Sequence, residues 1–322
     1  MHGENRFART VRASASVLSL TVLVLLVIGT PAVAGTWKTK ASLPTPVFGA
    51  HVAAINGVLY VAGGTNNSGA VSLLQAFNPS KDKWTSLAAM PAPVYYGTAA
   101  VVNSQLYVIG GITNSIYNSS LFVYDPPSNT WSTKASLSHP SALGVAGVIN
   151  GLLYLTTGQT NGSGWANLLD VYDPATDTWT GLAGSSAAHS APAGGVINGK
   201  LYVAGGSDGV DLVAGVEAYN PSTNAWTALA SMPSPVYAAA SAVIDGKLYA
   251  FGGNNNPSPV ATVQVYDPIK NTWSVTMPSL PAANNFAQAD VLYGVAFVVG
   301  GSNSSYQTVG TNDLYMQCPS IP

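Results

Sequence analysis

Short apolar runs alternate with polar turns along most of the chain, and no segment shows the spacing of an amphipathic helix. One unit shows the pattern. A stretch of small and apolar residues (98–102) leads through a turn to a Leu-Tyr-Val stretch ending in Gly-Gly, a polar loop, and an alternating stretch into Tyr-Asp-Pro. Short β-branched or aromatic runs bounded by Gly, Asn, Asp or Pro are typical of strands. The pattern predicts an all-β fold with four strands per unit.

The unit recurs with a fixed period. Tryptophans mark it at intervals of 47, 47, 48, 47 and 47 residues: Trp37, Trp84, Trp131, Trp179, Trp226 and Trp273. A Gly-Gly pair follows the second apolar stretch in five units, and Thr157-Gly158 replaces it in the other. Such a period is typical of repeat folds, in which each unit buries its apolar face against its neighbours. Trp165 alone falls out of phase.

The sequence Leu-Tyr-Val-Ala-Gly-Gly, followed by Tyr-Asp-Pro-x-x-(Asn/Asp)-x-Trp, resembles the kelch motif over nearly all of the chain after residue 35. The resemblance implies a six-bladed kelch-type β-propeller with four antiparallel strands per blade, spanning residues 35–322. Helical arrays do not fit the strand pattern. WD propellers would show Gly-His and Trp-Asp dipeptides, which this sequence lacks.

The ends of the repeat predict how the ring closes. Trp37 precedes the first Gly-Gly pair, and no Trp follows the last pair at Gly300-Gly301. The kelch Trp marks the outer strand of a blade, so the resemblance implies that the segment around Trp37 completes a sixth blade formed by residues 284–317. Such closure removes an open sheet edge.

The first 34 residues have a different character. Arg6, Arg9 and Arg12 precede a twelve-residue, mainly apolar run (17–28), and Ala32-Val33-Ala34 follows it. This pattern predicts a secretory signal peptide cleaved after Ala34. The alternative, an uncleaved membrane anchor, requires about 20 apolar residues. We therefore expect a secreted or extracytoplasmic protein without stable membrane insertion after cleavage.

The content of charged residues and cysteine limits the kinds of partner that the protein could bind. The chain after residue 34 contains eight Lys and no Arg against eleven Asp and one Glu, a net charge of −4. So few cations argue against nucleic acid, whose phosphates require Lys and Arg. Cys318 is the only cysteine, which excludes an intramolecular disulfide. It is either a buried apolar residue or a free thiol, and we expect a monomer.

Candidate ligand-binding residues lie where a kelch-like propeller would gather its variable loops. Trp165, Tyr117 and Tyr306 fall in the loops after Gly-Gly, within 159–166, 112–119 and 302–309. Five more aromatics fall where the links between blades enter the inner strands: Phe48, Tyr95, Tyr96, Tyr237 and Phe286. Ring faces beside Asn, Ser and Asp suit a carbohydrate or a peptide. The alternative is that the entry aromatics plug the channel or pack between blades.

The sequence offers few candidate residues for catalysis or metal binding. His51 and Asp290 are expected near one channel, where they would form either an acid–base pair or a structural hydrogen-bonded pair. His51, His139 and His189 belong to different blades, and Asp208 with Asp211 supplies too few ligands for calcium. We expect no metal and no cofactor.

Two enzyme families with kelch repeats are similar to this chain. Galactose oxidases hold copper with a Cys–Tyr cross-link, a second Tyr and two His, whereas Cys318 stands at the extreme C-terminus here. Sialic acid mutarotases also have six blades, but an anionic sugar is ordinarily met by Arg. The sequence therefore predicts an exported, non-catalytic recognition module that binds carbohydrate or an extracellular protein through its loop face. The alternatives are a small carbohydrate-active enzyme, mutarotase-like or oxidase-like, and a structural spacer.

Overall fold

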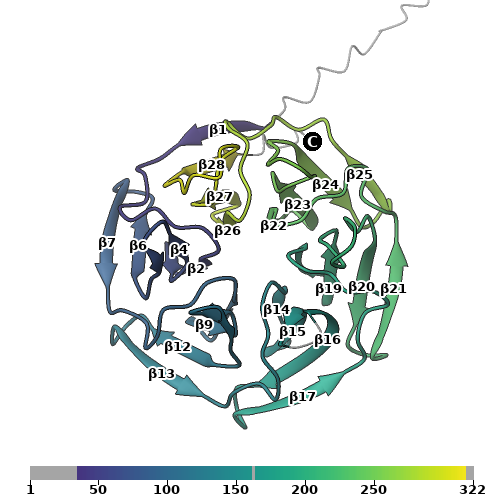
Figure 1. The fold of residues 1–322 in the computed structure, drawn as a ribbon, viewed down its shortest axis with the longest axis horizontal. Helices are drawn as coiled ribbons and strands as arrows, with labels where there is room; N and C mark the ends of the chain where they lie inside the picture. The colour runs from purple at the N-terminus through teal and green to yellow at the C-terminus, as the bar shows by residue number, and fades with distance from the viewer. Residues whose placement is uncertain (1–34, 162–163, 317–322) are drawn as a thin grey trace, which may run out of the picture. The chain divides into compact units, whose positions relative to one another are not determined.

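The computed structural model describes residues 35–161 and 164–316, which belong to one compact unit. Six four-stranded antiparallel sheets stand around a central axis as the blades of a propeller, as the sequence predicts (Figure 1). The described residues contain no helix long and apolar enough to cross a bilayer. The predicted signal peptide (1–34) and Cys318 lie outside the described residues.

The first three blades follow the chain from the inner to the outer strand. Blade 1 contains β2 (His51–Ile55), β3 (Val58–Ala62), β6 (Leu74–Asn78) and β7 (Lys83–Leu87). Blade 2 contains β8 (Thr98–Val102), β9 (Gln105–Ile109), β12 (Leu121–Asp125) and β13 (Thr130–Lys134). Blade 3 contains β14 (Ala146–Ile149), β15 (Leu152–Thr160), β16 (Gly164–Asp173) and β17 (Thr178–Leu182). Two small hairpins, β4–β5 (Thr65–Asn66, Gly69–Ala70) and β10–β11 (Ile112–Thr113, Ile116–Tyr117), project from blades 1 and 2.

The remaining blades repeat the pattern, and the last one takes its outer strand from the start of the described chain. Blade 4 contains β18 (Ala193–Ile197), β19 (Lys200–Ala204), β20 (Val216–Asn220) and β21 (Ala225–Leu229). Blade 5 contains β22 (Ala240–Ile244), β23 (Lys247–Phe251), β24 (Val263–Asp267) and β25 (Thr272–Ser274). Blade 6 contains β26 (Gln288–Leu292), β27 (Val295–Val299), β28 (Asn312–Met316) and β1 (Thr36–Thr39).

The ring closes through Trp37, which confirms the prediction from the repeat. β1 pairs antiparallel with β28 and places Trp37 opposite Tyr315. The Trp37 indole Nε1 donates to the carbonyl of Pro278 in the link from blade 5, at 3.1 Å. Thr39 Oγ1 donates to the Asp313 carboxylate at 2.7 Å. The first described strand thereby covers the outer edge of the last blade.

The recurrence of Trp, Tyr and Asn has a physical cause that blade 2 illustrates. Trp131 Nε1 donates to the carbonyl of Ala88, at the start of the link from blade 1, at 2.8 Å. Asn129, in the turn before Trp131, accepts hydrogen bonds from Tyr124 Oη at 2.8 Å and from the Ala88 amide at 3.0 Å. In this repeat the Trp and Asn side chains bind the link from the preceding blade, and we call this set of hydrogen bonds the clamp.

The core consists of six apolar clusters, each shared by two neighbouring blades. Phe77 of blade 1, for example, meets Phe297 of blade 6 with ring centroids 5.9 Å apart. Large side chains fill the wide outer part of each wedge. Small residues such as Ala and Gly occupy the inner strands, as the crowding near the axis requires. This arrangement leaves a channel along the axis.

Candidate functional site

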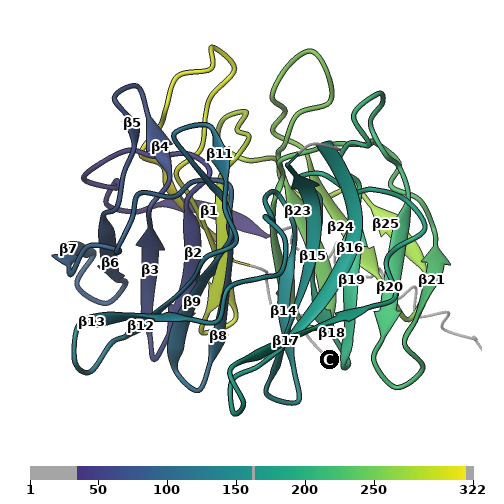
Figure 2. The same ribbon diagram turned by 60° about the horizontal axis from the view of Figure 1, so that its bottom comes forward.

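The loops after Gly-Gly and the links between blades lie on one face, which we call the loop face (Figure 2). Isolated bridges join each link to the loop of the blade that it enters, such as Phe48 with Thr65 and Tyr237 with Asn254. The opposite face carries the short turns within the blades. The turn after β2 uses Asn56 and Gly57, both with positive φ, which is the pattern of a type I′ hairpin.

A closed ring of backbone hydrogen bonds surrounds the channel on the loop face. Its members have φ between 51° and 59° and occupy the same place before each inner strand: Gly49, Tyr96, Leu143, Ala191, Ala238 and Phe286. Each amide donates to the carbonyl of the member on the preceding blade, at 2.7–2.9 Å, and Gly49 donates to Phe286 to complete the circle. We call this opening the mouth. Its backbone is therefore fixed by all six blades together.

Five aromatic side chains gather at one side of the mouth, and we call them the mouth rings: Phe48, Tyr95, Tyr96, Tyr237 and Phe286. Tyr96 and Phe286 are at the centre, with ring centroids 4.7 Å apart. Phe48 lies 6.1 Å from Tyr96, Tyr95 lies 5.0 Å from Tyr96, and Tyr237 lies 6.0 Å from Phe286. All five remain partly exposed. Burial raises the pKa of Tyr96, so its hydroxyl stays protonated.

The loop aromatics are each held by a neighbouring blade. Tyr117 Oη donates to Gln159 at 2.6 Å, and Gln159 in turn donates to Ser190 at 2.9 Å, which links blades 2, 3 and 4. Tyr306, 57% exposed, donates to the carbonyl of Pro257 at 2.5 Å. These hydrogen bonds fix the orientation of both aromatic rings.

The setting of Trp165 differs from the expected irregular loop. The strands of blade 3 extend beyond those of the other blades, so that Trp165 lies in β16 and pairs with Gln159. One face of its indole covers Gly209 of blade 4, where a Cβ would come within 2.3 Å of the ring. The side chain is still 43% exposed. The continued strand pairing, rather than a flexible loop, fixes this ring.

Below the mouth, the inner strands enclose a cavity of about 450 Å³ that is lined by both catalytic candidates, His51 and Asp290. No hydrogen bond or ion pair among the described residues joins the two. His51 Nδ1 donates to the carbonyl of Ala62 at 2.9 Å, and burial lowers its pKa to about 4. Asp290 accepts from the amides of Ala54 and Val291, both at 2.7 Å. The structure thus places both residues along one channel and gives each its own backbone partners.

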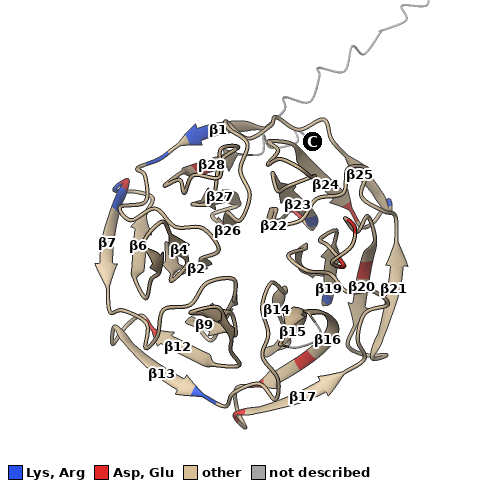
Figure 3. Cartoon of the chain, viewed as in Figure 1, with Lys and Arg blue, Asp and Glu red and all other residues tan. Residues whose placement is uncertain are grey.

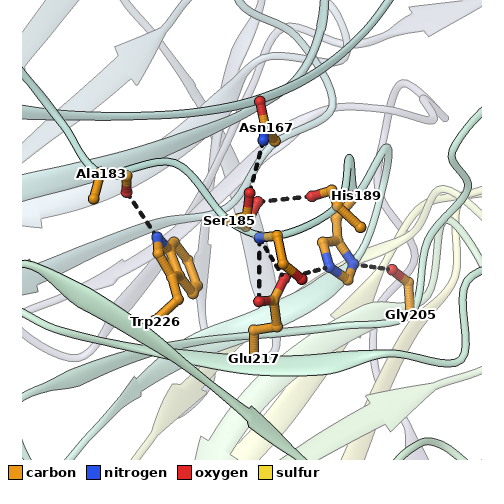
Figure 4. A network of polar contacts seen from close by, with 9 residues as sticks. Asn167, Ala183, Ser185, His189, Gly205, Glu217 and Trp226 are labelled. Atoms are coloured by element: carbon orange, nitrogen blue, oxygen red, sulfur yellow. Dashed lines mark hydrogen bonds and ion pairs between the residues drawn. The ribbon is translucent and has the colours of Figure 1, made fainter.

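The other two histidines pair with buried carboxylates that sequence inspection missed. His189 Nδ1 donates to the carbonyl of Gly205 at 2.7 Å, and its Nε2 lies 3.3 Å from Glu217 (Figure 4). Glu217 also accepts from the amide of Ser186 at 3.2 Å. The hydrogen bond from Nδ1 to Gly205 orients the ring so that Nε2 faces a carboxylate oxygen of Glu217. Gln75 and Gln264 occupy the place of Glu217 in their blades and hold the links there, so comparing the repeats would have shown this role.

His139 likewise lies 3.3 Å from Asp170. The three histidines of the described chain therefore do not converge. The described residues contain no group of three or more His, Cys, Asp or Glu placed to hold a metal ion.

Charge is distributed unevenly between the faces. The sequences of the loops (63–73, 110–120, 158–168, 205–215, 252–262, 300–311) and of the links (41–50, 88–97, 135–145, 183–192, 230–239, 275–287) contain no Lys or Arg. Asp208 and Asp211 are their only acidic residues. The other charges lie mainly towards the periphery of the ring (Figure 3). Around the mouth the loop face is therefore aromatic and polar but almost uncharged.

The model of the KLHDC2/KLHL20/DRC7 kelch-repeats domain matches this chain over residues 32–194 and again over 148–319. The chain belongs to the kelch-repeat family. No curated protein was found to match it. Among solved structures, the one titled "Structure of YjhT" is similar to this kelch propeller with a TM-score of 0.76 and 19% identity, over 88% of this chain and 98% of that chain. At that identity the likeness concerns the fold.

Proposed function

We propose that this kelch propeller is an exported, non-catalytic recognition module that binds a neutral carbohydrate at the mouth. The observation that carries the proposal is the convergence of the mouth rings from four different links on a face without Lys or Arg. Sugar rings present C–H faces that stack on aromatic side chains, and their hydroxyls need directed polar partners rather than charges.

The asymmetry of the mouth supports a small ligand that stacks on one wall. The aromatic side chains come from the links that enter blades 1, 2, 5 and 6. The links that enter blades 3 and 4 carry smaller residues at the two corresponding positions: Ala142 and Leu143, and Ser190 and Ala191. The wall formed by Tyr96 and Phe286 therefore faces a side with smaller residues. Exposed Asn and Ser side chains of the surrounding loops supply hydrogen-bond donors and acceptors.

Binding of the protein without residues 1–34 to an array of neutral and anionic glycans tests this proposal. We expect neutral glycans to bind, and Tyr237→Ala to weaken that binding by about tenfold, the loss typical of one aromatic contact. Tyr293→Ala is the matched control, because Tyr293 is 84% exposed in the turn after β26, away from the mouth. Retention of anionic glycans alone, or binding of an extracellular protein that Tyr237→Ala does not affect, would refute the proposal.

A further inference from the structure

One position on the wall of the channel, Asp290, carries a carboxylate where the other blades carry a small residue. Asp290 stands opposite Phe297 in blade 6, whereas the other inner strands carry a small residue opposite a tyrosine: Ala53, Ala100, Gly147, Gly195 and Ala242. No Lys, Arg or Glu lines the cavity, and no other Asp does. Asp290 is therefore the only carboxylate on the channel wall.

This carboxylate lacks a countercharge. Each of its oxygens accepts one backbone amide, from Ala54 or Val291, and can accept further hydrogen bonds. No Lys, Arg or His of the described chain forms an ion pair with it. Burial raises its pKa, because desolvation outweighs the two amide hydrogen bonds. A cation in the cavity would relieve that penalty.

We propose that the channel binds an organic ammonium cation, with Asp290 as its counter-ion. The cavity of about 450 Å³ suits a small organic ligand. A hard divalent ion is a poorer match, because it requires six or more oxygen ligands and one carboxylate supplies few of them. The inference goes beyond the proposed carbohydrate site, since it depends on Asp290 rather than on stacking at the mouth.

The residues between the mouth and Asp290 favour the entry of an ammonium group into the cavity. Phe286 lies four residues before Asp290 on the same chain segment, so the two are at most roughly 13 Å apart, the rise of four residues in an extended strand. Tyr96 and Phe286, the central pair of the mouth rings, line the cavity, and aromatic faces attract cations. The other titratable groups that line the cavity are Tyr96 and His51, which add no positive charge near neutral pH because burial lowers the pKa of His51 to about 4.

Isothermal titration with two molecules of the same shape tests the proposal. Choline and 3,3-dimethylbutan-1-ol differ in a single atom, a charged nitrogen in place of a carbon. We expect choline to bind at least about tenfold more tightly, the effect of one desolvated charge contact. Asp290→Asn should abolish this preference. Asp313→Asn is the matched control, since Asp313 lies in the same blade, bonds Thr39 and does not line the cavity.

Lower pH provides a second measurement that needs no substitution at Asp290. Protonation of Asp290 should weaken the binding of choline and leave that of the alcohol unchanged. The titration is repeated with His51→Gln, which removes the other group that gains charge as the pH falls. Four results would overturn the proposal. These are equal binding of both molecules, no binding of either, binding of alkali ions but not of choline, and a preference for choline that survives in Asp290→Asn. None of these results bears on glycan binding at the mouth, which the array tests separately.

Discussion

Replacing Trp37 by alanine would test the closure of the ring at a single side chain. The indole lies 5.0 Å from the Tyr315 ring and 5.7 Å from the Phe251 ring, and it donates its hydrogen bond to Pro278. Truncating a buried aromatic residue to alanine costs about 3–5 kcal/mol. Trp37 is partly exposed, so we expect the lower end of that range, about 3 kcal/mol.

A loss of about 3 kcal/mol should lower Tm by roughly 6–12 °C in a domain of this size. The matched control is Trp131→Ala, which removes an equivalent indole, bonded to Ala88, from a blade that is continuous in the chain. The two variants should lose similar stability in calorimetry. Only Trp37→Ala should let β1 separate locally from β28, because β1 leads in the chain to blade 1 and is held in blade 6 by its pairing with β28, whereas β13 follows β12 directly through a turn.

Hydrogen exchange distinguishes local separation from general weakening. In Trp37→Ala the amides of β1 and β28 should exchange faster than those of the other blades, because local opening exposes them without global unfolding. In Trp131→Ala no such difference should appear at β12 and β13. An unchanged Tm for Trp37→Ala, or faster exchange spread evenly over all blades, would show that β1 does not hold the ring closed.

Four further predictions concern buried charge, the loop face and metals. Glu217→Gln should keep the stability of the protein near neutral pH, because Gln can donate to His189 and accept from Ser186, whereas Glu217→Ala should cost about 3 kcal/mol in denaturant unfolding by leaving a buried partner unpaired. The pKa of His51 is lowered in the folded state, from 6.5 to about 4, so the folded protein resists protonation and should lose stability as the pH falls from 6.5 to about 4. The loss should approach about 3 kcal/mol and be absent in His51→Gln; a parallel pH dependence in both proteins would contradict it. Trp165→Ala should change the free energy of unfolding by only about 0.5 kcal/mol, and a loss of several kcal/mol would make this indole a packing residue. Elemental analysis after incubation with copper and dialysis against a chelator should find no stoichiometric copper, since the described residues offer no cluster of ligands; retained copper would revive the oxidase alternative.

The fold could be predicted because every repeat has the same arrangement of strands and the same characteristic residues. Trp, Tyr and Asn recur since each blade needs the same clamp onto its neighbour, as at Trp131, Tyr124 and Asn129. Closure could be predicted as well, because Trp37 lacked a blade of its own and the last blade lacked a Trp. These features depend on local spacing, which a sequence displays directly.

The site was harder to predict because it depends on departures from the repeat. The entry aromatics could be named, but their convergence follows from the backbone ring, which involves residues as different as Gly49, Leu143 and Ala191. Blade 3 has no Gly-Gly pair, and its strands continue to pair through a bulge at 157–159, which moved Trp165 from a loop into a strand. The pair of His189 with Glu217 is not apparent from sequence spacing, since 28 residues separate the partners.

The hydrogen-bonded backbone ring at the mouth bears on how the opening of such a propeller can vary. Only backbone atoms make its bonds, and the chain carries Gly, Tyr, Leu, Ala and Phe at these positions. Their positive φ disfavours β-branched residues, and a Cβ at Gly49 would come within 2.4 Å of the Tyr96 ring. Exchanges among residues that tolerate positive φ at the other five positions would change the size and polarity of the opening without altering the blades. The hydrogen bond from Gly49 to Phe286 joins the links that enter the first and last blades, so the backbone ring cannot close during synthesis until the final repeat is in place.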